Sequence, residues 1–159
     1  MALHFELAEF EARRTLVLES MARRQLDALL LFAPESHYWL TGYDTFGYCF
    51  FQCLIFTREG TFTLLTRSAD LRQARHTSLI EDIRIWTDQA GAGPAVQLRD
   101  LLNDLGLLGS RIGIEYDTHG MTGRIASSTA ASASVQAANS SRWRALGTPT
   151  MTVRISATW

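Results

Sequence analysis

The chain has 159 residues, enough for one domain, and its 47% hydrophobic and 19% charged residues give the composition of a globular protein with a sizeable core. Its formal net charge of -1 offers no electrostatic reason to expect nucleic acid or an anionic membrane as a partner. We expect no membrane span and no targeting segment, because the sequence has neither an apolar stretch of about 18 residues nor a basic, apolar leader.

The first forty residues predict a helix, a buried strand and a short second helix. Residues 6–24 carry an apolar stripe, with glutamates early and arginines late, which is the order that the helix dipole favours. Residues 26–33 form a near-continuous apolar run, which predicts a strand buried on both faces. Pro34 can begin a short helix, and Gly42 can end it.

A β-hairpin and further alternating elements are predicted downstream. Residues 50–58 and 61–66 are rich in β-branched and aromatic residues, and Gly60 between them can adopt the left-handed conformation of a hairpin turn. The remaining elements are a helix that Ser68 can cap, a strand, a helix and a strand, at residues 68–76, 83–86, 94–105 and 111–116. This order predicts an α/β sandwich with a mixed sheet.

The last part of the chain differs in composition from the rest. Residues 124–159 contain no Asp or Glu, whereas residues 1–123 carry all 16. The same last 36 residues are rich in Ala, Ser and Thr and contain four Arg. We therefore expect a domain over 1–123 and an atypical tail over 124–159, with at most a weak helix at 125–139 and no packed element after residue 140. The tail is either a disordered basic segment that binds an anionic partner or, as we favour, out-of-frame translation of GC-rich DNA.

Sequence motifs for catalysis or metal binding are absent. The four histidines stand singly, without H-E-x-x-H spacing, and no G-x-S-x-G elbow occurs. Every basic residue other than histidine is arginine, so a P-loop lysine is impossible. Gly91-Ala92-Gly93 is an incomplete dinucleotide fingerprint, because Val96 occupies its third small position. We predict no catalytic residue, no metal ligand and no cofactor in this chain.

The two cysteines, Cys49 and Cys53, do not predict a disulfide. If both lie on one strand, their Cα atoms are about 13 Å apart. A disulfide needs a separation of about 4.4–6.8 Å. We expect reduced thiols in the core of a cytoplasmic protein.

The segment from Gly42 to Gln52 is the most unusual part of the sequence. Rigid aromatic rings on a loop are typical anchors for a partner or a small ligand. The candidate lining residues are Tyr43, Asp44, Phe46, Tyr48 and Phe50. The alternative is that alternate rings simply enter the core, although Asp44 and Gly47 favour a loop over a regular strand.

Four segments in order carry a resemblance to a known family. They are the F-x-x-x-E-F-x-x-R-R pattern of Phe5–Arg14, the apolar run Leu26–Leu31, the segment Ser36–Tyr43 and the segment Arg111–Asp117. The third looks like N-x-x-Y-L-T-G-Y, from which Ser36 and Trp39 depart, and the fourth looks like R-I-G-I-E. Over residues 5–123 the chain resembles the N-terminal domain of the creatinase/prolidase/aminopeptidase P (pita-bread metallohydrolase) family. Bacterial members acting on ectoine-like compounds or Xaa-Pro dipeptides look most similar.

The resemblance implies a three-layer α/β/α sandwich, whose mixed central sheet we expect to hold about five to six strands. In the family this domain precedes a larger catalytic domain that holds the metal ligands or the catalytic histidine. The N-terminal domain builds the dimer, and its loop, here Tyr43–Phe50, leans over the active site of the partner subunit. Creatine-hydrolysing members place an Arg in this region, and its absence between Gly42 and Thr57 argues against creatine as the substrate.

The resemblance also implies what this chain lacks. We expect a truncated, non-catalytic piece of a hydrolase of the Xaa-Pro peptidase, creatinase or ectoine hydrolase type, with divalent metal confined to its full-length relatives. Its expected partner is a second copy of the chain, in a homodimer, or a catalytic domain. The alternative is a stand-alone small-molecule or protein-binding module that uses the Tyr43–Phe50 loop.

Overall fold

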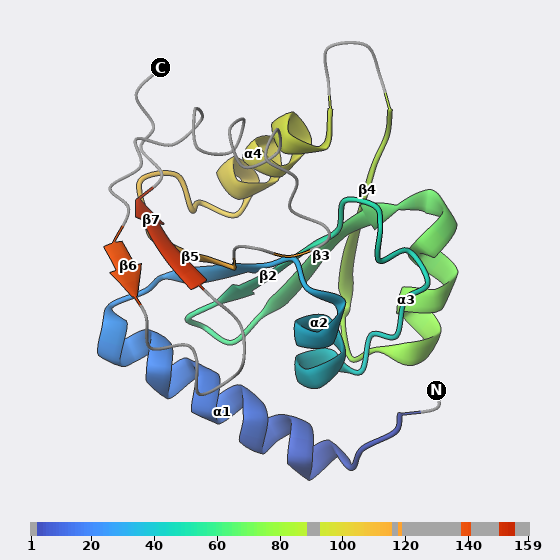
Figure 1. Cartoon of the computed structure of the whole chain (residues 1–159), viewed down its shortest axis with the longest axis horizontal. Helices are drawn as coiled ribbons and strands as arrows, with labels where there is room; N and C mark the ends of the chain where they lie inside the picture. Colours follow the sequence, from blue (N-terminus) through green and yellow to red (C-terminus); the bar gives the residue numbers. More distant parts are fainter. Residues whose placement is uncertain (1–2, 89–92, 116–117, 119–137, 141–149, 155–159) are drawn as a thin grey trace.

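The described part of the chain is organised by a seven-stranded mixed sheet, in the order β4-β3-β2-β1-β5-β7-β6 (Figure 1). The computed structural model describes residues 3–88, 93–115, 118, 138–140 and 150–154. Neighbouring strands pair antiparallel except for the β1–β5 and β3–β4 pairs, which are parallel. The strands are β1 (Ala28–Leu31), β2 (Cys53–Thr57), β3 (Phe62–Arg67), β4 (Asp82–Trp86), β5 (Arg111–Glu115), β6 (Ala138–Ser140) and β7 (Thr150–Arg154).

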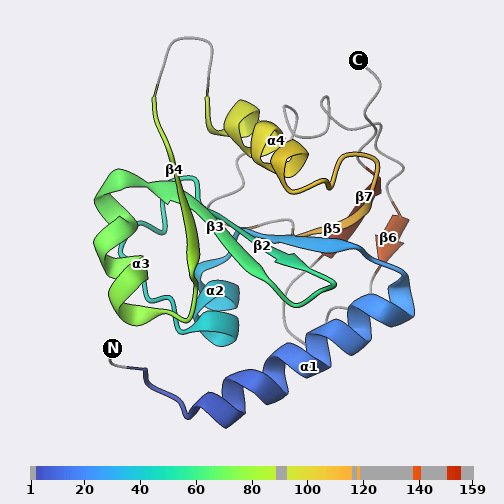
Figure 2. The same cartoon turned by 180° about the vertical axis from the view of Figure 1, so that it is seen from behind.

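Helices cover both faces of this sheet, so the chain folds as the predicted α/β/α sandwich. Three helices, α1 (Leu7–Arg24), α2 (Pro34–Thr41) and α3 (Leu71–Thr77), pack on one face, and α4 (Pro94–Asp104) packs on the other. Figure 1 shows α4 and α1 on opposite sides of the sheet, and Figure 2 shows the same arrangement from behind.

The strand β1 explains how one apolar run serves two cores. Leu29 and Leu31 face the cluster beneath α1, α2 and α3, whereas Ala28 and Leu30 face the cluster beneath α4. All four residues are buried, as expected for a strand with a helical layer on each side. This confirms the prediction of a strand buried on both faces.

The residues predicted to begin and end α2 and to form the hairpin turn are confirmed, whereas the predicted cap of α3 is not. Pro34 is the first residue of α2, and Gly42 ends the helix with φ 78° while its N–H donates to the carbonyl of Tyr38. Gly60 adopts φ +82° in the β2–β3 turn, where the Arg14 guanidinium lies against it. Ser68 does not cap α3, because it begins a 3₁₀ turn, η1 (Ser68–Asp70), that leads into the helix.

The tail differs from its prediction where the structure describes it. β7 pairs antiparallel with β5, and β6 pairs with β7, although no packed element was expected after residue 140 and about five to six strands were expected in the sheet. Main-chain hydrogen bonds form this pairing, so it needs no side-chain pattern that the sequence could display. The predicted weak helix at 125–139 lies outside the described residues, except at 138–139, which belong to β6. The domain boundary and the origin of the tail stay predictions.

Candidate functional site

A buried carboxylate fixes α2 against the carboxyl ends of two parallel strands. Glu115, the last residue of β5, has an exposed fraction of 0%. Its Oε2 accepts hydrogen bonds from the main-chain N–H groups of Phe32 (2.8 Å) and Ala33 (2.7 Å), and its Oε1 accepts one from Ser36 Oγ (2.6 Å). These donors lie at the start of α2, where N–H groups lack intrahelical partners and the helix dipole favours negative charge. The Glu115 side chain therefore links the carboxyl end of β5 to the residues that follow the carboxyl end of β1.

The buried side chains of His37 and Tyr43 continue this packing toward the C-terminal end of α2. His37 Nε2 donates to the carbonyl of Leu31 (2.9 Å), and the imidazole stacks on the ring of Tyr43 with centroids 6.0 Å apart. The Nδ1 atom of His37 is buried without a hydrogen-bond partner among the described residues. Burial lowers the pKa of His37 against the opposing influence of the Leu31 carbonyl, and burial raises the pKa of Tyr43.

An arginine from α1 holds the outer side of α2. The Arg13 guanidinium donates to the carbonyl of Trp39 (2.9 Å) and lies 4.1 Å from the ring centroid of Phe5 and 5.3 Å from that of Trp39. It also pairs with Glu9 one turn earlier in the helix. Rings around a largely buried guanidinium provide cation–π attraction as well as packing, so this contact ties the N-terminal segment to α2.

The segment that follows α2 is a loop, and it divides the predicted site residues into two groups. Tyr43 is fully buried, so its proposed role in lining a binding surface is not supported by its position. Phe46, Tyr48 and Phe50 have exposed fractions of 87%, 57% and 46%, and Asp44 is exposed. The interpretation in which alternate rings enter the core therefore holds for Tyr43 only. Phe46, Tyr48 and Phe50 form what we call the aromatic lip.

The loop is held from beneath by side chains that the sequence analysis did not single out. Gln52 Nε2 donates to the carbonyl of Gly47 (3.1 Å) and to Thr45 Oγ1 (3.2 Å). Arg67 and Asp70, an ion pair with an Nε–Oδ2 distance of 2.8 Å, also lie below the loop. These residues belong to β3, η1 and the start of the hairpin, so only folding brings them to the loop, and the sequence contains no local signal for them.

The two cysteines lie in different environments. Cys49 is exposed on the loop and Cys53 is buried in β2, and neither forms a disulfide. The expectation that both belong to the core is therefore wrong for Cys49, because β2 begins only at Cys53 and the preceding residues form the loop. Burial raises the pKa of the Cys53 thiol well above its usual value, which keeps it protonated and unreactive.

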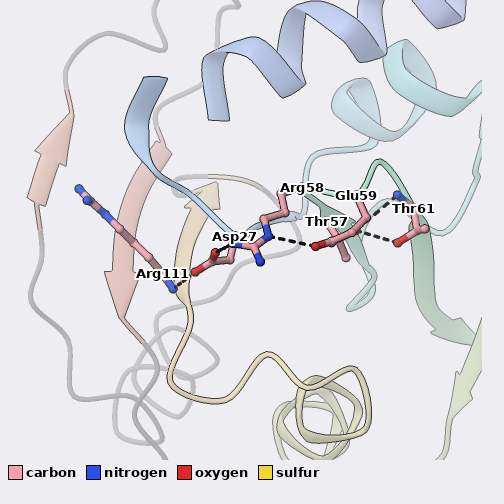
Figure 3. Close-up of polar contacts among 6 residues, drawn as sticks. All are labelled: Asp27, Thr57, Arg58, Glu59, Thr61 and Arg111. Atoms are coloured by element: carbon pink, nitrogen blue, oxygen red, sulfur yellow. Dashed lines mark hydrogen bonds and ion pairs between the residues drawn. The ribbon is translucent and has the colours of Figure 1, made fainter. Parts of the chain in front are cut away.

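A hollow of about 490 Å³ lies between the end of α1 and the β2–β3 turn. Hydrogen bonds connect the polar residues at its rim, as Figure 3 shows. Asp27 accepts one from Arg58 Nη1 (2.8 Å) and one from the main-chain N–H of Arg111 (2.8 Å). Thr57 and Thr61 hydroxyls bond across the turn (2.8 Å). These contacts join the starts of β1 and β5 to the hairpin, and we assign the cluster a structural role.

No group of three or more His, Cys, Asp or Glu side chains among the described residues could hold a metal ion. Within the same part of the chain, no helix has the length and apolar character needed to cross a membrane.

Comparison with known proteins gives a consistent family. A family model described as the creatinase/prolidase N-terminal domain matches residues 13–142. The ectoine hydrolase of Halomonas elongata is 28% identical over 126 residues, which cover 75% of this chain and 32% of that protein. An uncharacterized hydrolase/peptidase of Sinorhizobium fredii, y4tM, is 31% identical over 84 residues, or 52% of this chain and 21% of that protein. The chain thus spans a third or less of these two relatives.

Solved structures share the fold at low sequence identity. The N-terminal domain of Xaa-Pro dipeptidase from Lactobacillus brevis has a TM-score of 0.62 and 12% identity, covering 75% of this chain and 86% of that one. A Xaa-Pro aminopeptidase structure from Streptococcus pyogenes has a TM-score of 0.60 and 21% identity, covering 79% and 86%. At these identities the likeness establishes the arrangement of helices and strands.

The Glu115 contacts predict a large effect of a small substitution. Glu115→Gln removes the charge that three donors share, so we expect the free energy of unfolding to fall by about 1.5–3 kcal/mol in urea titrations. The control is Glu35→Gln, which removes a charge from the same first turn of α2 at an exposed position and should cost less than about 1 kcal/mol. Equal losses for the two variants would contradict the role assigned to Glu115.

The environment of His37 predicts a pH dependence of stability. Because burial lowers its folded-state pKa below the usual histidine value of 6.5, the unfolded chain binds a proton first as the pH falls. Stability should fall on acidification below about pH 6.5, by at most about 1.4 kcal/mol per pH unit from this group. His37→Gln keeps a donor for the Leu31 carbonyl but does not titrate. The urea midpoint of the wild type should therefore drop more than that of the variant between pH 7.5 and 5.5, and parallel drops would contradict the assignment.

Proposed function

Because the chain belongs to the creatinase/prolidase N-terminal domain family, we propose that it is the non-catalytic N-terminal domain of a creatinase, Xaa-Pro dipeptidase or ectoine hydrolase-type enzyme. In this proposal the domain assembles a dimer and the Tyr43–Phe50 loop lines the active site of the partner subunit. In this proposal a divalent metal belongs to the catalytic region of full-length relatives, as the family resemblance implies, and none of the residues that the structure describes here ligates it.

The aromatic lip is the observation that carries this proposal. Three large rings on one short loop are exposed, and such apolar exposure costs free energy unless another surface covers it. Aromatic residues are the most frequent energetic anchors of protein interfaces, because they bury a large area with few rotatable bonds. The aromatic lip therefore suits contact with a second protein surface, which in this proposal is the active-site region of the partner subunit.

The chemistry of the loop restricts what it can recognise. Between Gly42 and Thr57 the chain has no Arg or Lys, so the loop itself offers no cation for a substrate carboxylate. Asp44 is exposed, and the ring face of Phe50 already holds a guanidinium, that of Arg67. These side chains suit an apolar or positively charged surface better than an anionic one.

The assembly role predicts self-association through the lip. Sedimentation equilibrium of the 159-residue chain should show a dimer, and Phe46→Ser with Tyr48→Ser should weaken it at least tenfold, or about 1.4 kcal/mol. Leu16→Ser is the matched control, because Leu16 on α1 has the same exposed fraction, 57%, as Tyr48. A monomer at all concentrations would contradict the assembly role, and equal weakening by the control would place the contact away from the lip.

The non-catalytic assignment predicts the absence of turnover. Purified chain incubated with Mn²⁺ and either Xaa-Pro dipeptides or ectoine should release no product above the buffer rate, because no residue of this chain is assigned to activate water. Product release can be followed by chromatography of the amine-containing products. Turnover that scales with protein concentration and survives repurification would overturn the assignment.

A further inference from the structure

An ion pair between Arg67 and Asp70 lies beneath the loop that follows α2. Arg67 ends β3, and Asp70 ends η1 just before α3. The guanidinium contacts the carboxylate at two points, Nε–Oδ2 at 2.8 Å and Nη2–Oδ1 at 3.3 Å. Their side chains are 24% and 8% exposed, so the pair is shielded from most of the solvent and from much of its screening.

The carboxylate of this pair lies directly under the loop backbone at Gly47. A Cβ atom built on Gly47 would lie 2.8 and 2.9 Å from the two carboxylate oxygens of Asp70, and 2.5 Å from Gln52 Nε2. A Cβ atom at this position would therefore require the Asp70 carboxylate and the Gln52 amide to shift, so the glycine allows both side chains to lie against the loop backbone. The Gly47 N–H is meanwhile bonded to Thr45 Oγ1 (2.9 Å).

The guanidinium of the same pair holds the other end of the turn. Arg67 Cζ lies 3.5 Å from the ring centroid of Phe50, a stacking distance at which cation–π attraction is strong. The main-chain N–H of Phe50 donates to the carbonyl of Gly47 (2.9 Å), which closes the turn between the two anchored residues. One ion pair thus contacts both ends of the turn that carries Tyr48.

We propose that Arg67 and Asp70 are positioning residues that preform the aromatic lip: Asp70 seats Gly47, Arg67 holds the ring of Phe50, and Phe46 and Tyr48 are thereby presented to solvent in a fixed arrangement. The inference rests on the proposed function, since it assigns the pair to the surface that contacts the partner. Its physical basis is preorganisation, because a loop ordered before binding loses less conformational entropy when the partner arrives.

Limited proteolysis of the full chain tests the proposal without any partner. Chymotrypsin cleaves after exposed aromatic residues, so cleavage after residues 46, 48 and 50 reports opening of the loop. Arg67→Ala should accelerate cleavage at these sites at least about tenfold at a temperature where circular dichroism shows the fold intact. Arg67→Lys keeps the positive charge but loses the two-point contact with Asp70 and the flat stack on Phe50, so its cleavage rate should fall between those of the wild type and Arg67→Ala.

The matched control is Arg58→Ala, which removes an ion-paired arginine at the opposite end of β2 and should leave cleavage of the loop unchanged. Cleavage of Arg67→Ala at the wild-type rate would overturn the proposal, and so would equal acceleration by the control.

If Arg67→Ala does not fold, amide hydrogen exchange in the wild-type protein tests whether the loop is ordered in the absence of a partner. The Gly47 and Phe50 amides should exchange at least about 100-fold more slowly than in an unstructured peptide, and unprotected amides would overturn the proposal. These measurements contain no partner subunit, so a preformed loop combined with a strictly monomeric chain would reject the proposed function and leave the positioning role intact.

Discussion

The buried carboxylate of Glu115 is the constraint on which the arrangement of this domain depends. A charged group with no exposed surface is stable only when hydrogen bonds replace its lost hydration, and here two main-chain amides and the Ser36 hydroxyl do so. The three donors lie in the two residues before α2 and in its first turn, so the carboxylate fixes the start of that helix to the end of β5. The orientation of α2 in turn determines where the chain emerges after Gly42.

The four segments that carry the family resemblance meet around this one short helix. Arg13 from the first segment reaches the carbonyl of Trp39, and the Leu31 carbonyl from the second receives the imidazole N–H of His37. Glu115 from the fourth segment reaches Ser36 in the third. The motifs are therefore parts of a single packing unit, which gives a physical reason for their occurring together. Ser36, although it departs from the family pattern, still supplies a donor.

The loop that carries the aromatic lip is held by polar side chains. Beneath the loop lie the Gln52 amide and the Arg67–Asp70 pair, whereas Phe51 turns inward and joins the α4 side of the core. Hydrogen bonds have directional geometry that apolar contacts lack, so these polar side chains fix the backbone without burying the rings. The same loop thus combines order in its main chain with apolar side chains in solvent, which is the combination that an interface anchor needs.

Local sequence patterns determined the elements themselves. The apolar run of β1, the proline and glycine that bound α2, and the glycine in the β2–β3 turn all act through the conformations of their own or adjacent residues. The glycine and aspartate after α2 likewise indicated a loop that carries exposed rings. Which ring is buried was not predictable, because α2 and its neighbours decide that Tyr43 enters the core.

Contacts between distant segments were decided only by the tertiary structure. Glu115 meets Phe32 across 83 positions of sequence, and Arg67 meets Phe50 from a different strand, so neither pairing leaves a periodic trace along the chain. β7 joins the sheet through main-chain bonds that any residue except proline can make, so composition alone did not reveal it. Side-chain patterns along the chain specify local conformation and which face of an element is buried. The residues that pair with a buried charge, and the strand that pairs with a free sheet edge, come from distant parts of the chain and are decided by the tertiary structure.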